Sequence, residues 1–345
     1  MKSKTLLNIL GAVLAFMGIT MVAPILISAF YNESDFIGFV YSSAICISIG
    51  IPIWYFTRTN RSLTNRDGFA IVTFSWIMTA LAGSLPFYLS GSIPDFTNAF
   101  FESMSGVTTT GASILGNAEV MPHLPIGIES LPHGILFWRS FIQWIGGMGI
   151  VVFYIAILPL LGVGGVQLFK AEVPGPVADK ITPRVRETAK YLWLVYTGFT
   201  LAEVIALMIA GMPVFDAVCH SLTTMPTGGF STKNASIGFY DSSAIHYIIT
   251  FFMFVAGVNF TLHFKAIAGD FKGYFRDKEF LAYLSIIMGI SIIIFLSLVS
   301  HGGALSQINV RDSIFQTVSI LTTTGFGSPD YELWPYFVQI ILLVL

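Results

Sequence analysis

The sequence predicts an all-α polytopic membrane protein in which spanning helices alternate with short helices that enter and leave the bilayer from one face. Hydrophobic residues make up 54% of the 345 residues and charged residues only 10%, which is too apolar for a soluble globule. Apolar runs recur at the roughly 20 residues that a helix needs to cross a hydrocarbon core of about 30 Å. A Thr-Gly phrase also recurs, at residues 109–112, 227–230 and 323–326.

The apolar runs define eight candidate spans. They cover residues 6–30, 37–57, 68–91, 137–164, 191–211, 243–264, 281–300 and 335–345. The first run follows Lys2 and Lys4 as in a signal peptide, but no clear small-residue cleavage site follows it, so we expect a retained helix.

The distribution of cations orients these spans. With the amino terminus in the cytoplasm, fourteen of the 17 Lys and Arg residues lie in inner segments, and only Arg139, Lys233 and Arg311 lie outside. Cytoplasmic loops of membrane proteins carry such an excess of positive charge. The bias therefore predicts a cytoplasmic amino terminus and places all three Thr-Gly phrases on the outer side.

Three segments between the outer ends of spans are too short and too polar to cross the bilayer. Each begins with a polar residue that we expect to cap a helix, namely Asn98, Asp216 and Asp312. A glycine follows each cap after 13, 12 and 13 residues, at Gly111, Gly228 and Gly325. This spacing fits about three helical turns and then an extended tripeptide. The repetition predicts three units of helix, re-entrant helix, Thr-Gly turn and helix around a pseudo-symmetry axis.

Such turns can serve an ion pathway. A monovalent cation sheds its water only when several oxygens replace the hydration shell together, and backbone carbonyls do so without a full charge. Non-helical backbone at membrane depth also persists only where it lines water or is buried in protein. The alternative is that each Thr-Gly pair is an ordinary turn. Repetition at matched distances, rather than any one tripeptide, favours the ion pathway.

The ordered motifs resemble the Trk/Ktr/HKT superfamily of potassium transporters and, within it, the TrkH type. The resemblance covers nearly the whole chain and rests on FFES at 100–103, GVTTTGA at 106–112, QWIGGMGI at 143–150, ILP at 157–159, LGVGG at 161–165, AEVPGP at 171–176, GGFST at 228–232, YFRD at 274–277 and TGF at 324–326. It implies four pore repeats and an extra amino-terminal helix pair.

On this resemblance the domains are an amino-terminal two-helix domain at 1–66 and pore repeats at 67–190, 191–280 and 281–345. The potassium-binding filter residues implied are Thr109, Thr110 and Gly111, then Pro226, Thr227 and Gly228, and then Thr323, Thr324 and Gly325. Glycine rather than serine at 111 goes in the family with preference for potassium over sodium.

The resemblance further implies potassium uptake through an inner or plasma membrane, with K⁺ as the transported ion and no cofactor. The implied partners are the lipid bilayer, a second copy of the chain in a homodimer, and a cytosolic nucleotide-binding (TrkA-like) regulatory subunit. No nucleic acid is implied.

The chain departs from the family pattern at its carboxyl end. It stops 20 residues after Gly325 (345 − 325), inside the third repeat, and the fourth repeat is missing. We expect either a fragment of a longer protein or a pore completed by another chain. A non-conducting partner or scaffold subunit is the alternative function. An intramembrane enzyme is disfavoured, because the sequence has no HExxH pattern and no serine-hydrolase signature around Ser105.

Four further polar residues lie in apolar surroundings. Asn259 and His263, one turn apart in the sixth span, either line the inner vestibule or form an interhelical hydrogen bond. Glu203, in the fifth span, is either part of an ion or proton route or a buried paired or protonated acid. Arg139 either snorkels to the outer surface or acts beside the pore mouth.

Overall fold

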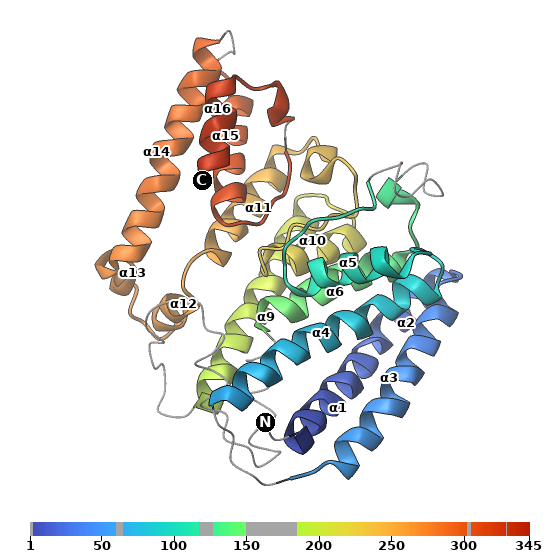
Figure 1. Ribbon diagram of the computed structural model, residues 1–345. Helices are drawn as coiled ribbons and strands as arrows, with labels where there is room; N and C mark the ends of the chain where they lie inside the picture. The colour runs from blue at the N-terminus through green and yellow to red at the C-terminus, as the bar shows by residue number, and fades with distance from the viewer. Residues whose placement is uncertain (1–2, 60–64, 117–126, 150–184, 302–304, 329) are drawn as a thin grey trace. The chain divides into compact units, whose positions relative to one another are not determined.

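The computed structural model describes residues 3–59, 65–116, 127–149, 185–301, 305–328 and 330–345, and within these ranges every regular element is helical (Figure 1). The chain divides into two compact units, Met1–Trp193 and Leu194–Leu345.

Five helical stretches among the described residues are long and apolar enough to cross a membrane. They are Ser3–Tyr31, Phe36–Phe56, Asp67–Leu89, Lys190–Ile209 and Lys278–Ser300. They correspond to five of the eight predicted spans. The predicted span at 137–164 falls partly outside the described residues.

The first unit contains α1 (Ser3–Thr20), α2 (Val22–Tyr31), α3 (Phe36–Phe56), α4 (Asn65–Leu89), α5 (Phe96–Val107), the short 3₁₀ helix η1 (Gly127–Ser130) and α6 (His133–Gly147). Helix α1 packs on α3 and α4. The Ser43 hydroxyl on α3 donates to the Gly18 carbonyl at 2.7 Å, which fixes this close contact. Pro24 has no N–H to donate to Thr20, which explains why α1 ends at that residue.

Helices α5 and α6 are held by contacts from the rest of the first unit. The Ser103 hydroxyl on α5 donates to the Ala80 carbonyl of α4 at 2.8 Å. At the start of α6, the His133 N–H donates to a carboxylate oxygen of Glu33 at 2.6 Å, and the His133 ring stacks on Tyr31. A carboxylate at this point also complements the positive end of the helix dipole. The α2–α3 connection therefore anchors the helix that carries Arg139.

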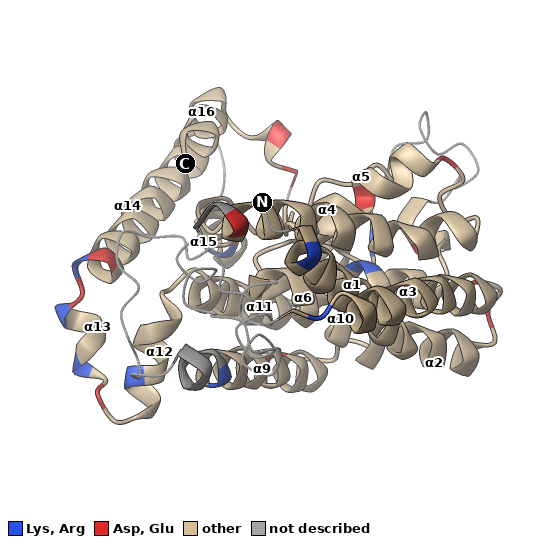
Figure 2. Cartoon of the chain, turned by 60° about the horizontal axis from the view of Figure 1, so that its bottom comes forward, with Lys and Arg blue, Asp and Glu red and all other residues tan. Residues whose placement is uncertain are grey.

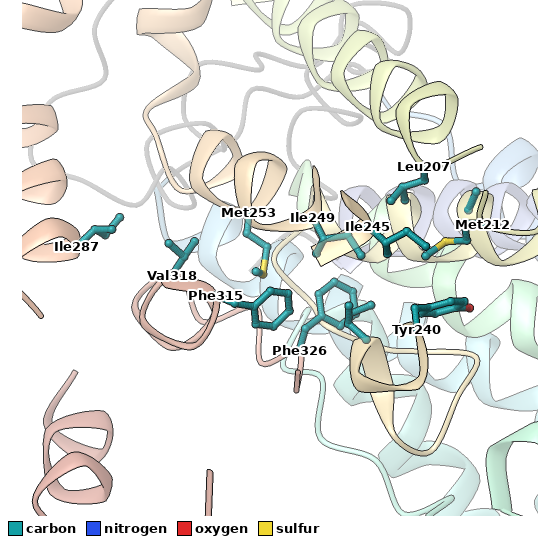
Figure 3. Close-up of a cluster of buried hydrophobic side chains, with 12 residues drawn as sticks. Leu207, Met212, Tyr240, Ile245, Ile249, Met253, Ile287, Phe315, Val318 and Phe326 are labelled. Carbon is teal, nitrogen blue, oxygen red and sulfur yellow. The ribbon is translucent and has the colours of Figure 1, made fainter. Parts of the chain in front are cut away.

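The second unit is built around one apolar core. Its helices are α9 (Val185–Ile209, which begins before the unit boundary), α10 (Val214–Thr224), η2 (Ser236–Phe239), α11 (Ser243–Ala256), α12 (Phe260–Ile267), α13 (Lys272–Arg276), α14 (Lys278–Ser300), α15 (Gln307–Leu321), η3 (Tyr331–Leu333) and α16 (Tyr336–Val344). Helix α15 packs on both α11 and α14. Figure 3 shows the core side chains, among them Met253, Phe315 and Phe326, pointing toward one another from these elements.

The three predicted helix caps are wrong. Helix α5 is capped by Asp95, whose carboxylate accepts the Asn98 N–H at 2.9 Å, so Asn98 lies in the first turn. Helix α10 begins after Pro213 and α15 after Ser306, so Asp216 and Asp312 also lie inside their helices. Asn98 and Asp216 lie in the first turn of their helices, and Asp312 lies in the second turn of α15. Residues of these types also serve as caps, so their identity alone does not show where a helix begins.

The predicted sixth span is broken rather than straight. Helices α11 and α12 meet at an angle of 99°, and Asn259 caps α12 by accepting the Thr261 N–H at 3.0 Å. Asn259 and His263 therefore do not share a face of one continuous helix. The His263 Nε2 instead donates to the Val255 carbonyl at 2.9 Å, and the Tyr274 hydroxyl bonds its Nδ1 at 2.7 Å. These bonds fix the bend.

Charged residues of both signs gather beyond this bend. Figure 2 shows blue segments in α12, in α13 and at the start of α14, with red segments among them; the region holds Lys265, Lys272, Arg276 and Lys278, and also Asp270, Asp277 and Glu279. The position fits a segment outside the hydrocarbon core, where Lys and Arg side chains remain hydrated.

Candidate functional site

The three Thr-Gly turns share an unusual backbone conformation. Thr109, Thr227 and Thr323 have φ values of 56°, 56° and 59°, in the left-handed region that β-branched residues rarely enter. Two residues later, a glycine again has positive φ: 75° at Gly111, 69° at Gly229 and 78° at Gly325. The repeated phrase in the sequence therefore folds into the same turn three times.

The shared conformation shifts the alignment of the second repeat with the other two by one residue. By conformation, Gly229 rather than Gly228 corresponds to Gly111 and Gly325. The separation from Asp216 to Gly229 is 13 residues (229 − 216), equal to the separations in the other two repeats. The predicted spacing of 12 was wrong because the two adjacent glycines left the register ambiguous. Gly228 takes the place of Thr110 and Thr324.

The amide groups of each turn bond back to the helix that precedes it. The first left-handed threonine of each turn donates its N–H to the carbonyl three residues earlier, at 3.0 Å for Thr109, 2.9 Å for Thr227 and 2.9 Å for Thr323. In a planar trans peptide the carbonyl points opposite to the N–H, and the described residues contain no cis peptide. The carbonyl oxygens of Thr108, Pro226 and Thr322 therefore point away from their own helices.

The next amides extend this arrangement. Thr110 N–H donates to the Ser105 carbonyl and Gly228 N–H to the Thr223 carbonyl, both at 2.9 Å. One residue further on, Gly229 N–H donates to the Thr223 carbonyl at 3.3 Å and Gly325 N–H to the Ser319 carbonyl at 3.2 Å. By the same geometry, the carbonyls of Thr109, Thr227 and Thr324 also turn away from the helices. Each turn thus presents main-chain oxygens on the side opposite its short helix.

In the second unit, two of these turns lie backbone against backbone. A Cβ atom on Gly229 would stand 1.8 Å from the carbonyl oxygen of Thr324, so no other residue fits there. Beyond the turns, the Gly238 N–H donates to the Gly327 carbonyl at 3.1 Å, and the Gly327 N–H donates to Ser236 Oγ at 3.2 Å. The second and third predicted filter segments therefore form one continuous main-chain surface.

In the first unit, a buried ion pair supports the turn. Arg139 is 1% exposed, and its Nε bonds a carboxylate oxygen of Glu102, on α5, at 2.9 Å. The same carboxylate accepts the Ser113 hydroxyl at 2.9 Å and the Ile114 N–H at 3.2 Å. Arg139 also donates to Ser113 Oγ at 3.2 Å. The prediction that Arg139 snorkels to the surface is wrong, because its partner lies on the short helix.

Helix α6 approaches α5 closely beside this pair. A Cβ atom on Gly146 would lie 1.9 Å from the carbonyl oxygen of Val107, the last residue of α5. The two helices can approach this closely only because residue 146 has no side chain.

In the second repeat, a neutral histidine supports the turn. His220 is fully buried, and its Nδ1 lies 2.7 Å from the Asp216 carbonyl, which can only accept. The Nδ1 therefore carries the proton, and Nε2 accepts the hydroxyl of Ser231 at 2.9 Å. Ser231 Oγ in turn accepts the Lys233 N–H at 3.0 Å. The segment after Gly229 is thus fixed to α10.

Glu203 lies buried in α9 with 0% exposure. Neither carboxylate oxygen has a hydrogen-bond partner among the described residues. The Thr224 hydroxyl interacts with this carboxyl group, but it directs its hydrogen to the His220 carbonyl at 2.8 Å. An ionised carboxylate without a donor is very costly in such surroundings. Of the predicted alternatives, the structure favours a neutral acid over an ion-paired one.

Sequence reasoning missed Glu102, Ser113, His220 and Ser231 as supports of the turns. Their signal was present, since each acid or histidine precedes a serine by 11 residues in two repeats. The corrected register shows that the two pairs occupy equivalent positions, since Glu102 and His220 both lie nine residues before the glycine of their turn. Among the described residues no group of three or more His, Cys, Asp or Glu side chains could hold a metal ion.

The chain is similar to a known family, to named relatives and to a solved structure. Residues 37–345 match the TrkH family, described as "Cation transport protein". The Trk system potassium uptake protein TrkH of Vibrio parahaemolyticus is 42% identical, over 99% of this chain and 70% of that protein. Its counterpart in Escherichia coli K12 is also 42% identical, with the same coverage. The crystal structure of the potassium transporter TrkH from Vibrio parahaemolyticus superposes with a TM-score of 0.85 at 39% identity, covering 100% of this chain and 69% of that one.

Proposed function

Because the chain belongs to the TrkH family of cation transport proteins, we propose that it is the pore-forming subunit of a Trk-type potassium uptake system. The relatives at 42% identity are named for potassium uptake. The single observation that carries the proposal is the threefold turn, whose carbonyl oxygens point away from the helix that precedes it.

The proposed ion contacts are main-chain oxygens. They belong to the predicted filter residues Thr109, Thr110, Gly111, Pro226, Thr227, Gly228, Thr323, Thr324 and Gly325, with Gly229 added as the match of the two other glycines. Carbonyl dipoles can replace the hydration shell of K⁺ and still release the ion, since none of them carries a full charge. The transported ion then needs no cofactor and no catalytic residue.

We further propose a location in the cell inner membrane with the amino terminus in the cytoplasm. A homodimer and a cytosolic nucleotide-binding regulatory subunit complete the proposed assembly. The asymmetry of Lys and Arg supports the orientation. The basic segment around α13 lies on the predicted cytoplasmic side and offers charge for contacts with anionic lipid headgroups.

The test is complementation of cells that lack their own potassium uptake systems, with the protein expressed from its complete reading frame. We expect growth at limiting K⁺ and saturable Rb⁺ uptake. Gly111→Ser should lower the preference for K⁺ over Na⁺, whereas the matched control Gly116→Ser, at a glycine with open space around it, should not. A membrane-inserted protein that gives neither growth nor uptake would contradict the proposal and fit a non-conducting partner instead.

A further inference from the structure

The short helix before each turn, namely α5, α10 and α15, carries a buried polar residue at one fixed position. Glu102, His220 and Gln316 each lie nine residues before the positive-φ glycine of their repeat (111 − 102, 229 − 220 and 325 − 316). They are 0%, 0% and 1% exposed. Buried polar residues are uncommon without a partner, so three of them at one repeated position require a shared reason.

In the first two repeats the buried polar residue bonds a serine at the same position beyond the turn, and in the first repeat it also accepts the N–H of Ile114, the residue after that serine. Glu102 accepts the hydroxyl of Ser113, and His220 accepts the hydroxyl of Ser231. Both serines lie two residues after the glycine (113 − 111 and 231 − 229). The side chains that accept these hydroxyls differ in charge, yet the bond joins equivalent positions.

In the third repeat, the buried polar residue makes no equivalent bond to the described residues beyond the turn. The residue two positions after Gly325 is Gly327, which has no hydroxyl, and the Gln316 Oε1 has no hydrogen-bond partner among the described residues. Gly327 is instead held from the second repeat, through the Gly238 N–H and the Ser236 hydroxyl. The residues on either side of Gly327 are bonded to α15, since the Ser319 hydroxyl donates to the Phe326 carbonyl at 2.8 Å and the Ser328 hydroxyl to Asp312 at 3.3 Å. All three segments are therefore fixed beyond the turn, but at the position two residues after the glycine only the first two are bonded by a side chain of their own helix.

Resting on the proposed function, we propose that Glu102 and His220 are positioning residues that set ion selectivity. Through Ser113 and Ser231, they fix the outer end of the first two filter turns. Neither side chain touches the ion. Arg139 neutralises Glu102, and an imidazole that accepts the Ser231 hydroxyl at Nε2 carries its one proton on Nδ1 and is uncharged, so neither bond places net charge beside the turn.

The physical consequence concerns the spacing of carbonyl oxygens. A turn fixed at both ends resists closing around an ion smaller than K⁺, whereas a turn released at its outer end can adapt its oxygens to Na⁺. Selectivity then depends on the number and freedom of the coordinating carbonyls. Loss of one fixing bond should therefore lower discrimination without changing any residue of the turn.

The experiment removes only the bonding hydroxyls, in the full-length protein, by Ser113→Ala and Ser231→Ala. The matched controls are Ser105→Ala and Ser221→Ala, which remove buried hydroxyls on the same two helices that have no partner among the described residues. Rb⁺ uptake is measured with increasing Na⁺ as competitor, and each variant is quantified in the membrane. Ser113→Thr and Ser231→Thr keep the hydroxyl and test for rescue.

We expect both bond-removing variants to lose about three- to tenfold in the preference for Rb⁺ over Na⁺, the contribution typical of one hydrogen bond. The controls should retain it, and the threonine variants should recover most of it. Equal preference in all variants, or equal loss in the controls, would overturn the positioning role. A wild-type protein without Rb⁺ uptake would instead reject the proposed function itself, so the two failures are distinguishable.

Discussion

A threonine in the left-handed region is the feature that distinguishes these turns from ordinary ones. Its branched Cβ makes this backbone costly, so surrounding bonds must hold it in place. At Thr109 and Thr323 the neighbouring threonine hydroxyls help, since Thr108 pairs with Thr110 at 2.8 Å and Thr322 with Thr324 at 2.8 Å. In the second turn, the residue before Thr227 is Pro226. The proline ring fixes the φ angle of Pro226 itself, which restricts the backbone next to Thr227.

The glycine of each turn should respond to alanine in a graded way. A Cβ on Gly229 would meet the Thr324 oxygen, whereas a Cβ on Gly325 would meet nothing within 4 Å and suffers only from its φ of 78°. We expect Gly229→Ala to abolish Rb⁺ uptake and Gly325→Ala to reduce it partly. Gly91→Ala, with φ of 75° and open space outside the turns, is the matched control for backbone strain. If all three variants reduced Rb⁺ uptake equally, the close contact between Gly229 and the Thr324 oxygen would not be what uptake depends on.

Glu203 should tolerate a neutral isostere. Glu203→Gln preserves the size and the polarity of a protonated carboxyl group, so we expect near-normal expression and Rb⁺ uptake. Glu203→Lys places an ammonium group in a site with 0% exposure and should strongly reduce the amount of folded protein. Membrane-fraction immunoblots and uptake assays measure both effects. A folded but inactive Gln variant would mean that the carboxylate charge is required.

At the scale of elements, the contact between α5 and α6 depends on a buried ion pair. Removing one partner of such a pair leaves an uncompensated charge and typically costs about 3–5 kcal/mol. We therefore expect Glu102→Ala to lower the thermal stability of the purified protein strongly. The double variant Glu102→Gln with Arg139→Met should recover much of that loss, since it leaves no buried charge. A double variant as unstable as the single one would argue that the geometry of the pair, rather than its charge, holds the helices.

The sequence predicted the spanning helices well and their ends poorly. Apolar composition over roughly 20 residues is a property of a whole segment, so it survives errors at single positions. A cap depends on one residue, and Asn98 and Asp95 are equally plausible from composition. The bend at Asn259 was missed for the same reason, because the apolar run continues through it. The family resemblance was confirmed by the comparisons, whereas its filter residues remain predictions.

Local spacing could reveal the pairs of Glu102 with Ser113 and of His220 with Ser231, but not the ion pair that supports the first turn. Arg139 and Glu102 are 37 residues apart and belong to different helices, so only the folded chain brings them together. His220 shares its position with a glutamate and a glutamine, which hides the equivalence from any search by residue type. The three residues can be aligned only through the positive φ of the glycine that follows each of them.

For the whole molecule, the proposed orientation makes a direct prediction about labelling. Both native cysteines, Cys46 and Cys219, are buried, so background reaction with a maleimide should be low. Glu332→Cys lies at an exposed position on the predicted outer side, and Lys272→Cys lies at an exposed position in the predicted cytoplasmic segment. An impermeant maleimide should label the first variant in intact cells and the second only after permeabilisation. The reverse pattern would invert the orientation.

The bond from Gly238 to Gly327 also constrains the order of assembly. Gly327 has no side chain that could bond its own helix, and its main-chain bonds come from a loop that lies earlier in the chain. Synthesis proceeds from the amino terminus, so this loop is made before the segment that it must hold. The earlier repeat can therefore act as an internal template for the later one, and damage to the template should appear as misfolding downstream.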